Sequence, residues 1–215
     1  MAWLPALTTV SLFFAGVIFW LWQTVYRRRF EVAEASMIAF EKAVDGLNHI
    51  RNPFSFESES KEVEIPEALK VPPEQYRRYG VIFVRAEKTK EVFAELRPAM
   101  ILAEIHLGTA ASEALSELWT IRHEVVVAAG ALANCEKEFY DNTPEAVTSK
   151  KSSDQFYKDQ QNKLYNLGKS SAHDVITPRI EQARKALADA CRPYLELPRF
   201  LTCFSRKKTP RKASP

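Results

Sequence analysis

The chain is poor in glycine, and this excludes the common phosphate-binding loops. Its 215 residues include six glycines, and the closest two, Gly108 and Gly130, are 22 positions apart. A dinucleotide-binding turn and a P-loop both need glycines within about five positions of one another, so that the backbone can approach a phosphate. The nucleophile elbow G-x-S-x-G requires two glycines four positions apart and is excluded as well.

Cysteine is also scarce. The three cysteines, Cys135, Cys191 and Cys203, form no C-x-x-C pattern, which excludes thioredoxin-like redox chemistry and ordinary zinc knuckles. An odd number without a tight pattern fits a reducing compartment better than a disulfide scaffold. Cys135 and Cys191 lie on or beside apolar stripes, so we interpret them as buried thiols. Cys203 is a candidate for acylation if the tail around it touches a membrane.

The four histidines do not occur at metal-ligand spacing. They are His49, His106, His123 and His173. His123-Glu124 resembles the start of an H-E-x-x-H motif, but three valines follow and the second histidine is missing. We therefore expect surface histidines, no metal site and no cofactor.

Charged side chains are absent from Ala2 to Tyr26. A helix over Trp3–Tyr26 would be about 36 Å long at about 1.5 Å per residue, enough to cross an apolar bilayer core of about 30 Å. Aromatic rings prefer the headgroup level, and Trp3 lies at one end while Trp20, Trp22 and Tyr26 lie at the other. This pattern predicts a transmembrane anchor, residues 1–29 with its basic collar.

Two alternatives to the anchor are a cleaved signal peptide and a buried core helix. A signal peptide needs a basic start and a shorter apolar run, and a core helix would show a polar stripe.

Arg27, Arg28 and Arg29 follow the apolar run directly. The positive-inside rule then places the short N-terminus outside and the body in the cytoplasm, with a bacterial inner membrane as the favoured location.

From Phe30 onward, apolar residues recur in steps of three and four, which is the spacing of one face of a helix. Stripes that are one face wide need partners, so we predict an all-α fold: a single N-terminal transmembrane helix followed by a cytoplasmic antiparallel helical bundle over residues 30–198. The four stripes are Ala33, Met37, Phe40, Val44 and Leu47; Phe93, Leu96, Met100, Ala103 and Leu107; Ala114, Leu118, Ile121, Val125, Ala128, Leu132, Cys135 and Phe139; and Ile176, Ile180, Ala183, Leu187, Ala190 and Tyr194.

Several residues mark helix boundaries. Thr143-Pro144-Glu145 is a typical helix start, and Gly168 is a typical stop. Thr177-Pro178 can start another helix or kink a longer one. The stretch from Val84 to Tyr140 is very long for one helix. Whether Gly108 divides it stays open at this stage, and Pro98 would kink it.

Residues 51–83 form a proline-rich, acidic connection. We expect one or two short helical turns there, such as 73–79, and a short strand is an option for residues 80–84 (GVIFV). A solvated linker and a functional connection both fit this composition.

Charge is segregated along the chain. The net charge is +3, yet residues 30–198 hold 21 basic against 27 acidic residues, which argues against nucleic acid as a partner. The tail, residues 199–215, has six basic residues and no acid. We predict that it contacts anionic lipids; a solvated tail and a nuclear-targeting signal are the alternatives. The residues of this contact are Phe200, Phe204, Arg206, Lys207, Lys208, Arg211 and Lys212.

These patterns favour an interaction or accessory protein held at a membrane. Its partners would be the lipid bilayer and a protein, either another protein or a second copy. One alternative is a membrane-anchored enzyme or effector whose site is built from scattered residues such as Glu104, His123 and Glu124. Another is a self-associating protein that perturbs the membrane.

Overall fold

The chain forms helices only, within the residues that the structure describes. This computed structural model describes residues 3–67, 71–134, 144–165 and 174–196, with side chains from Leu12 onward except those of 144–153. The expectation of an all-α fold is confirmed over these ranges. The helices are α1 (Trp3–Ile50), α2 (Glu57–Lys61), α3 (Pro73–Lys88), α4 (Lys90–Leu107), α5 (Thr109–Asn134), α6 (Pro144–Leu164) and α7 (Thr177–Leu195).

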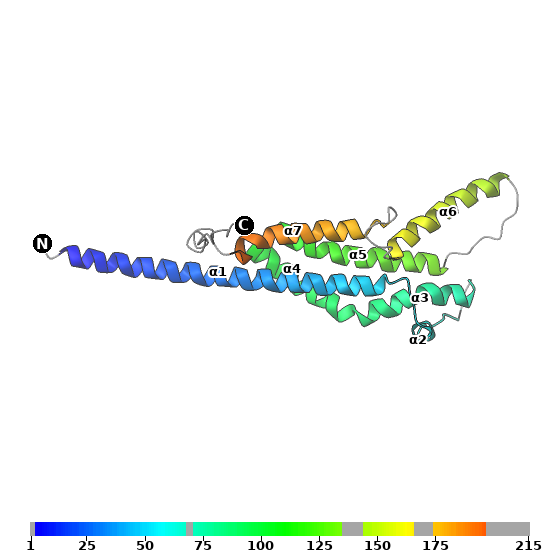
Figure 1. Cartoon of the computed structure of the whole chain (residues 1–215), viewed down its shortest axis with the longest axis horizontal. Helices are drawn as coiled ribbons and strands as arrows, with labels where there is room; N and C mark the ends of the chain where they lie inside the picture. The colour runs from blue at the N-terminus through cyan, green and yellow to red at the C-terminus, as the bar shows by residue number, and fades with distance from the viewer. Residues whose placement is uncertain (1–2, 68–70, 135–143, 166–173, 197–215) are drawn as a thin grey trace, which may run out of the picture.

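Four long helices, α1, α4, α5 and α7, pack into an up-and-down bundle. α1 contacts α4 and α7, and α5 contacts the same two helices on the opposite side. Successive legs alternate in direction, with α3 leading into α4 as one leg (Figure 1). α3 and α6 pack on α5 at the end of the bundle that lies away from the N-terminus. The predicted helical bundle is therefore confirmed.

The apolar stripes supply the core of this bundle. In the stripe of α5, all the described members, from Ala114 to Leu132, are at most 5% exposed. Phe40, Phe93 and Leu187 bring the other three helices to the same cluster, each at 0% exposure. Burying one large apolar side chain contributes about 1.5–3 kcal/mol, so these stripes are the main source of stability. Cys135 and Phe139 lie outside the described residues.

α1 is one continuous helix, although its two halves have different surroundings. Its N-terminal half projects beyond the bundle, whereas the half that ends at Ile50 packs inside it (Figure 1). The exposed fraction is 72% at Leu12 and still 51% at Val25, and it falls to 3% at Val32. No break occurs at the arginines 27–29, so the expected anchor and the first bundle helix are a single rigid element.

Among the residues whose side chains are described, we find no helix with a stretch apolar and long enough to traverse a membrane. The expected span, Trp3–Tyr26, lies partly outside those residues, because the side chains of 3–11 are not described. The transmembrane anchor therefore stays a prediction.

Gly108 separates α4 from α5, which answers the question left open by the sequence. Its backbone has φ 103° and ψ 174°, a conformation that is essentially restricted to glycine. The chain can thus reverse direction in one residue. Pro98 lies inside α4, as expected. The expected starts at Pro144 and Thr177 are confirmed by α6 and α7, while Gly168 lies outside the described residues.

The connection after α1 is shorter than expected. The short helical turn expected over residues 73–79 is the start of α3, which begins at Pro73 and runs through Gly80 to Lys88, and α2 is a further short helix in the connection. The strand considered for residues 80–84 is therefore wrong. Tyr79, Ile82 and Ala86, at i, i+3 and i+7, are buried in the bundle core, so tertiary packing outweighs the strand preference of β-branched residues.

Candidate functional site

A buried ion pair joins three helix ends. Arg51, one residue after α1, has no exposed surface, and its Nη2 lies 2.8 Å from Oδ1 of Asp174. The same guanidinium donates to two carbonyls at the C-terminal end of α6, that of Lys163 in its last turn at 3.1 Å and that of Tyr165 just after it at 2.9 Å. Arg51 therefore fixes the ends of α1 and α6 relative to the start of α7.

Asp174 also caps α7. Its Oδ1 accepts hydrogen bonds from the backbone N–H groups of Ile176 at 3.0 Å and Thr177 at 3.1 Å, and its Oδ2 accepts one from the Thr177 hydroxyl at 2.6 Å. Burial alone would raise the pKa of Asp174, but the hydrogen bonds from Thr177 and Arg51 outweigh it and the pKa is lowered. Burial lowers the pKa of Arg51, and Asp174 opposes this shift. Nη1 of Arg51 is buried and has no hydrogen-bond partner among the described residues.

A second buried arginine, Arg85 on α3, organises the connection between α1 and α2. It pairs with both carboxylate oxygens of Glu59, at 3.1 and 2.7 Å, and donates to the carbonyls of Asn52 at 2.7 Å and Phe54 at 2.5 Å. These hydrogen bonds from Arg85 are the main reason why the pKa of Glu59 is lowered. The connection is thus held against α3 by its own backbone.

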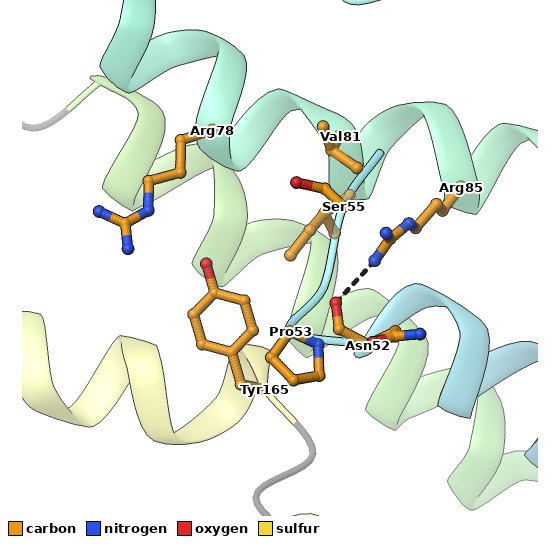
Figure 2. A pocket seen from close by; sticks show the side chains of 8 residues that line it. Asn52, Pro53, Ser55, Arg78, Val81, Arg85 and Tyr165 are labelled. Carbon is orange, nitrogen blue, oxygen red and sulfur yellow. Dashed lines mark hydrogen bonds between the residues drawn. The ribbon is translucent and has the colours of Figure 1, made fainter. Parts of the chain in front are cut away.

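Arg85 and Tyr165, whose carbonyl Arg51 holds, both line a cavity of about 180 Å³, which we call the polar cavity. Figure 2 shows the hydroxyl groups of Tyr165 and Ser55 directed towards the side on which Arg78 lies, with Pro53 below them. A larger cavity of about 370 Å³ shares Arg78 and lies between α3 and α6. The polar cavity is lined by Asn52, Pro53, Ser55, Arg78, Val81, Ile82, Arg85 and Tyr165.

The segment that forms one wall of the polar cavity has two faces. Pro53 and Ser55 line the cavity, whereas Phe54 and Phe56 are 80% and 75% exposed. Arg85 holds the backbone on which these two rings stand, so they present a small apolar surface to the surroundings. We call these two phenylalanines the aromatic tip.

Ion pairs on the bundle surface attach α7 to its neighbours. Arg179 pairs with Glu117 at 2.8 Å and with Glu124 at 2.6 Å, both on α5. Arg184 pairs with Glu41 of α1 at 2.8 Å. The hydrogen bonds from Arg179 lower the pKa of Glu124, which keeps this carboxylate ionised and engaged.

This pairing bears on the residues proposed for a scattered catalytic site. Glu124 is held by Arg179, while His123 and Glu104 are exposed. Within the described part of the chain, no three His, Cys, Asp or Glu side chains are arranged to hold a metal ion. Cys191 is buried, as expected, and burial raises the pKa of its thiol to about 11.

The predicted anchor residues meet the bundle at Tyr26. The Trp22 and Tyr26 rings stack 5.4 Å apart, and the Tyr26 hydroxyl donates to the carbonyl of Tyr194 at 3.2 Å. Arg29 lies 5.6 Å from the centre of the Tyr194 ring, and Arg27 pairs with Glu31 at 3.0 Å. Trp20, Trp22, Arg27 and Arg28 are exposed. The side chain of Trp3 and all the predicted tail residues lie outside the described residues.

Sequence reasoning missed Arg51, Arg85 and Asp174. A capping signal could have found Asp174, because it stands three residues before Thr177, at the start of a predicted helix. Nothing near Arg51 or Arg85 marks them as buried, since arginine is seldom found in a protein interior.

Comparisons with known proteins leave the chain unassigned. No protein-family model, curated protein or solved structure matches it. A proposal about function therefore depends on the geometry described above.

Proposed function

We propose that this chain is a single-pass membrane protein that presents a helical bundle, as an interaction or accessory module, at the cytoplasmic face of a membrane. The observation that carries the proposal is the projecting half of α1. The exposed side chains from Leu12 to Val25 include ten large apolar residues, and no charged side chain stands between Ala2 and Arg27. An apolar surface of this extent is costly in water and stable in a bilayer.

The geometry of α1 supports a rigid anchor. Bundle contacts begin at Tyr26, immediately before the arginines 27–29 that the positive-inside rule would keep at the cytoplasmic surface. From Arg29 to Ile50 the helix continues for about 32 Å at about 1.5 Å per residue. The aromatic tip, which follows the end of α1, would therefore lie about 30 Å from the membrane surface.

The aromatic tip is the surface we propose for a protein partner. Phe54 and Phe56 precede the segment 57–67, in which three glutamates are already paired with basic residues, so the tip offers two apolar anchors beside a polar surface. The pairs are Glu57–Lys61, Glu59–Arg85 and Glu62–Lys88. Aromatic residues that bury completely are typical anchors of an interface. A complementary partner would offer an apolar pocket with polar groups around its rim.

Membrane attachment can be tested by fractionation. The full chain should remain with membranes after alkaline carbonate extraction, whereas residues 30–215 alone should be released and remain helical. A reporter fused after Pro215 should behave as cytoplasmic. Recovery of the full chain in the carbonate supernatant, or an exported reporter, would contradict the anchor or its orientation.

Partner binding can be tested by crosslinking and mass spectrometry of the full chain in mild detergent. Replacing Phe54 and Phe56 by serine should remove the crosslinked partner and leave helicity unchanged, because both rings are exposed. Phe156→Ser is the matched control, since Phe156 is 43% exposed on α6, away from the tip. If Phe156→Ser loses the crosslinked partner to the same degree, the interface lies elsewhere than at the aromatic tip.

Self-association is a second candidate function, because the apolar half of α1 could also be covered by another copy. Nanodiscs that hold either one copy or several copies of the chain distinguish self-association from an accessory role. Crosslinks between copies through residues 12–25, with no other protein captured, would favour self-association over an accessory role.

A further inference from the structure

The polar cavity combines three structural elements around one arginine. Arg78 comes from α3, Ser55 from the connection before α2, and Tyr165 from the residue that follows α6. Two buried arginines fix these walls. Arg51 holds the carbonyl of Tyr165, and Arg85 holds the carbonyls of Asn52 and Phe54. The backbone that carries Tyr165 and Ser55 is therefore held in place before any ligand arrives, which reduces the ordering cost of binding.

The charges around the cavity favour an anion. The charge of Arg85 is offset by Glu59, which pairs with it at 2.7 Å. Arg78 is exposed and forms no ion pair with a carboxylate in the described part of the chain. Glu74 lines the larger cavity beside Arg78 and would repel an anion there. Among the described residues, no acidic side chain lines the polar cavity, so an anion that pairs with Arg78 is better placed in it.

The hydroxyl groups can act as donors to such an anion. Burial raises the pKa of Tyr165, and Tyr79 adds to the shift, while Arg78 acts in the opposite direction. Tyr165 therefore keeps its proton at neutral pH. In Figure 2 its hydroxyl and that of Ser55 are turned towards the side of Arg78.

We propose that the polar cavity binds a small organic anion, with its carboxylate or phosphate held by Arg78, Tyr165 and Ser55. Guanidinium groups pair well with planar or tetrahedral oxyanions, and hydroxyls complete the hydrogen bonds. Pro53, Val81 and Ile82 form an apolar wall for the carbon part of the ligand. A volume of about 180 Å³ is smaller than the ~300–1,000 Å³ of drug-sized pockets, so the ligand has few heavy atoms.

The test uses the full chain in detergent micelles and titration calorimetry at constant ionic strength. The probes are acetate, benzoate and inorganic phosphate, which separate a carboxylate from a phosphate and an ion with an apolar body from one without. We expect saturable binding of at least one probe. Arg78→Gln should weaken it about tenfold or more, because a charge-assisted contact is lost. Tyr165→Phe should weaken it less.

Arg77→Gln is the matched control. Arg77 is the neighbouring exposed arginine on α3 and lines neither cavity, so its replacement changes the net charge equally. The Arg77→Gln variant should bind the probe with an affinity within about twofold of that of the unchanged chain. The proposal is overturned if no probe saturates, if Arg78→Gln binds as well as the unchanged chain, or if Arg77→Gln weakens binding to the same degree. Circular dichroism of each variant confirms that the bundle remains folded.

Discussion

Arg51 and Asp174 lie 123 positions apart in the chain, yet their side chains form a 2.8 Å ion pair in the interior, where each is at most 2% exposed. The pair connects the first bundle helix with the last. A buried ion pair gains little over apolar packing, but removing one partner leaves an uncompensated charge. The pair therefore sets the geometry of this end of the bundle more than it adds to overall stability.

The first prediction concerns this pair. Asp174→Asn keeps a side chain able to cap α7 but leaves the Arg51 charge buried without its counterion. We expect the free energy of unfolding to fall by about 3 kcal/mol, measured by urea denaturation in detergent. Adding Arg51→Met should restore much of this loss, because the unpaired charge is gone. A double variant whose loss equals the sum of the two single losses would show that the residues are not coupled.

The second prediction concerns acid. Folding lowers the pKa values of Asp174, Glu59 and Glu124 below their ordinary values of 3.8, 4.5 and 4.5, respectively. A lowered carboxyl pKa stabilises the fold above the ordinary value, and this contribution is lost as the pH falls through the folded value. The midpoint temperature of thermal unfolding should stay constant between about pH 7 and 5 and should decrease steadily as the pH falls below about 5. In the Arg51→Met, Asp174→Asn double variant the fall should be shallower.

The third prediction concerns Gly80, in the interior of α3. A Cβ there would lie 2.4 Å from Cγ1 of Val63, whose side chain is buried against the helix. Replacing a helix glycine by alanine normally stabilises by about 1 kcal/mol, but overpacking costs about 1–3 kcal/mol. Gly80→Ala should therefore lower the free energy of unfolding by about 1 kcal/mol.

The sign of this effect depends on Val63. In a Val63→Ala background the obstructing methyl groups are absent, so Gly80→Ala should raise the stability by up to about 1 kcal/mol. The measurement is the difference between the two backgrounds in urea denaturation. The same sign in both would mean that Val63 does not pack on Gly80.

The fourth prediction concerns the core stripe of α5. Leu132 has no exposed surface, and Leu132→Asp removes apolar contacts and buries a charge. We expect a loss of about 4 kcal/mol or more, enough to unfold a domain of marginal stability, seen as lost helical circular dichroism. Glu113→Lys is the control, because Glu113 is exposed on the same helix. Equal tolerance of both substitutions would contradict the bundle core.

Glu117 is unsuitable as that control, and the reason shows what the sequence could not predict. Glu117 is partly exposed on α5, but its partner Arg179 lies 62 positions away on another helix, so its replacement would also break an ion pair. Local spacing identifies which face is buried, since it depends only on neighbours within two turns. Ion pairs between helices depend on the packed arrangement.

The same difference between local spacing and tertiary contacts explains why the sequence predicted the core residues but not the polar cavity. The stripes of Leu118 and Ile180 were predictable because a helix face repeats every three or four residues. The polar cavity joins Ser55, Arg78 and Tyr165, which no short motif connects. Its walls depend on Arg51 and Arg85, whose burial follows from tertiary contacts with backbone carbonyls.

The last prediction concerns the basic tail, residues 199–215, which lies outside the described residues. α7 ends at Leu195, and the carbonyl of Tyr194 accepts a hydrogen bond from Tyr26, at the base of the projecting half of α1. Glu196, the last described residue before the tail, lies beside Tyr26 and thus near the arginines 27–29, where the proposed anchor would meet the bilayer. Each basic residue near an anionic surface contributes about 1 kcal/mol, so six could supply several kcal/mol before ordering costs.

Residues 30–215 should therefore bind vesicles that contain anionic lipid and not neutral vesicles, measured by co-sedimentation. Added salt should release the protein, because screening shortens the reach of the charges to about 10 Å near 0.1 M. A variant that ends at Pro198 should lose this binding and keep its helicity, since α7 ends before the truncation. The acidic body, with 21 basic against 27 acidic residues over 30–198, would be repelled by the same surface. If the truncated protein sediments with anionic vesicles as well as the longer one does, the contact lies in the body and the basic tail has another partner.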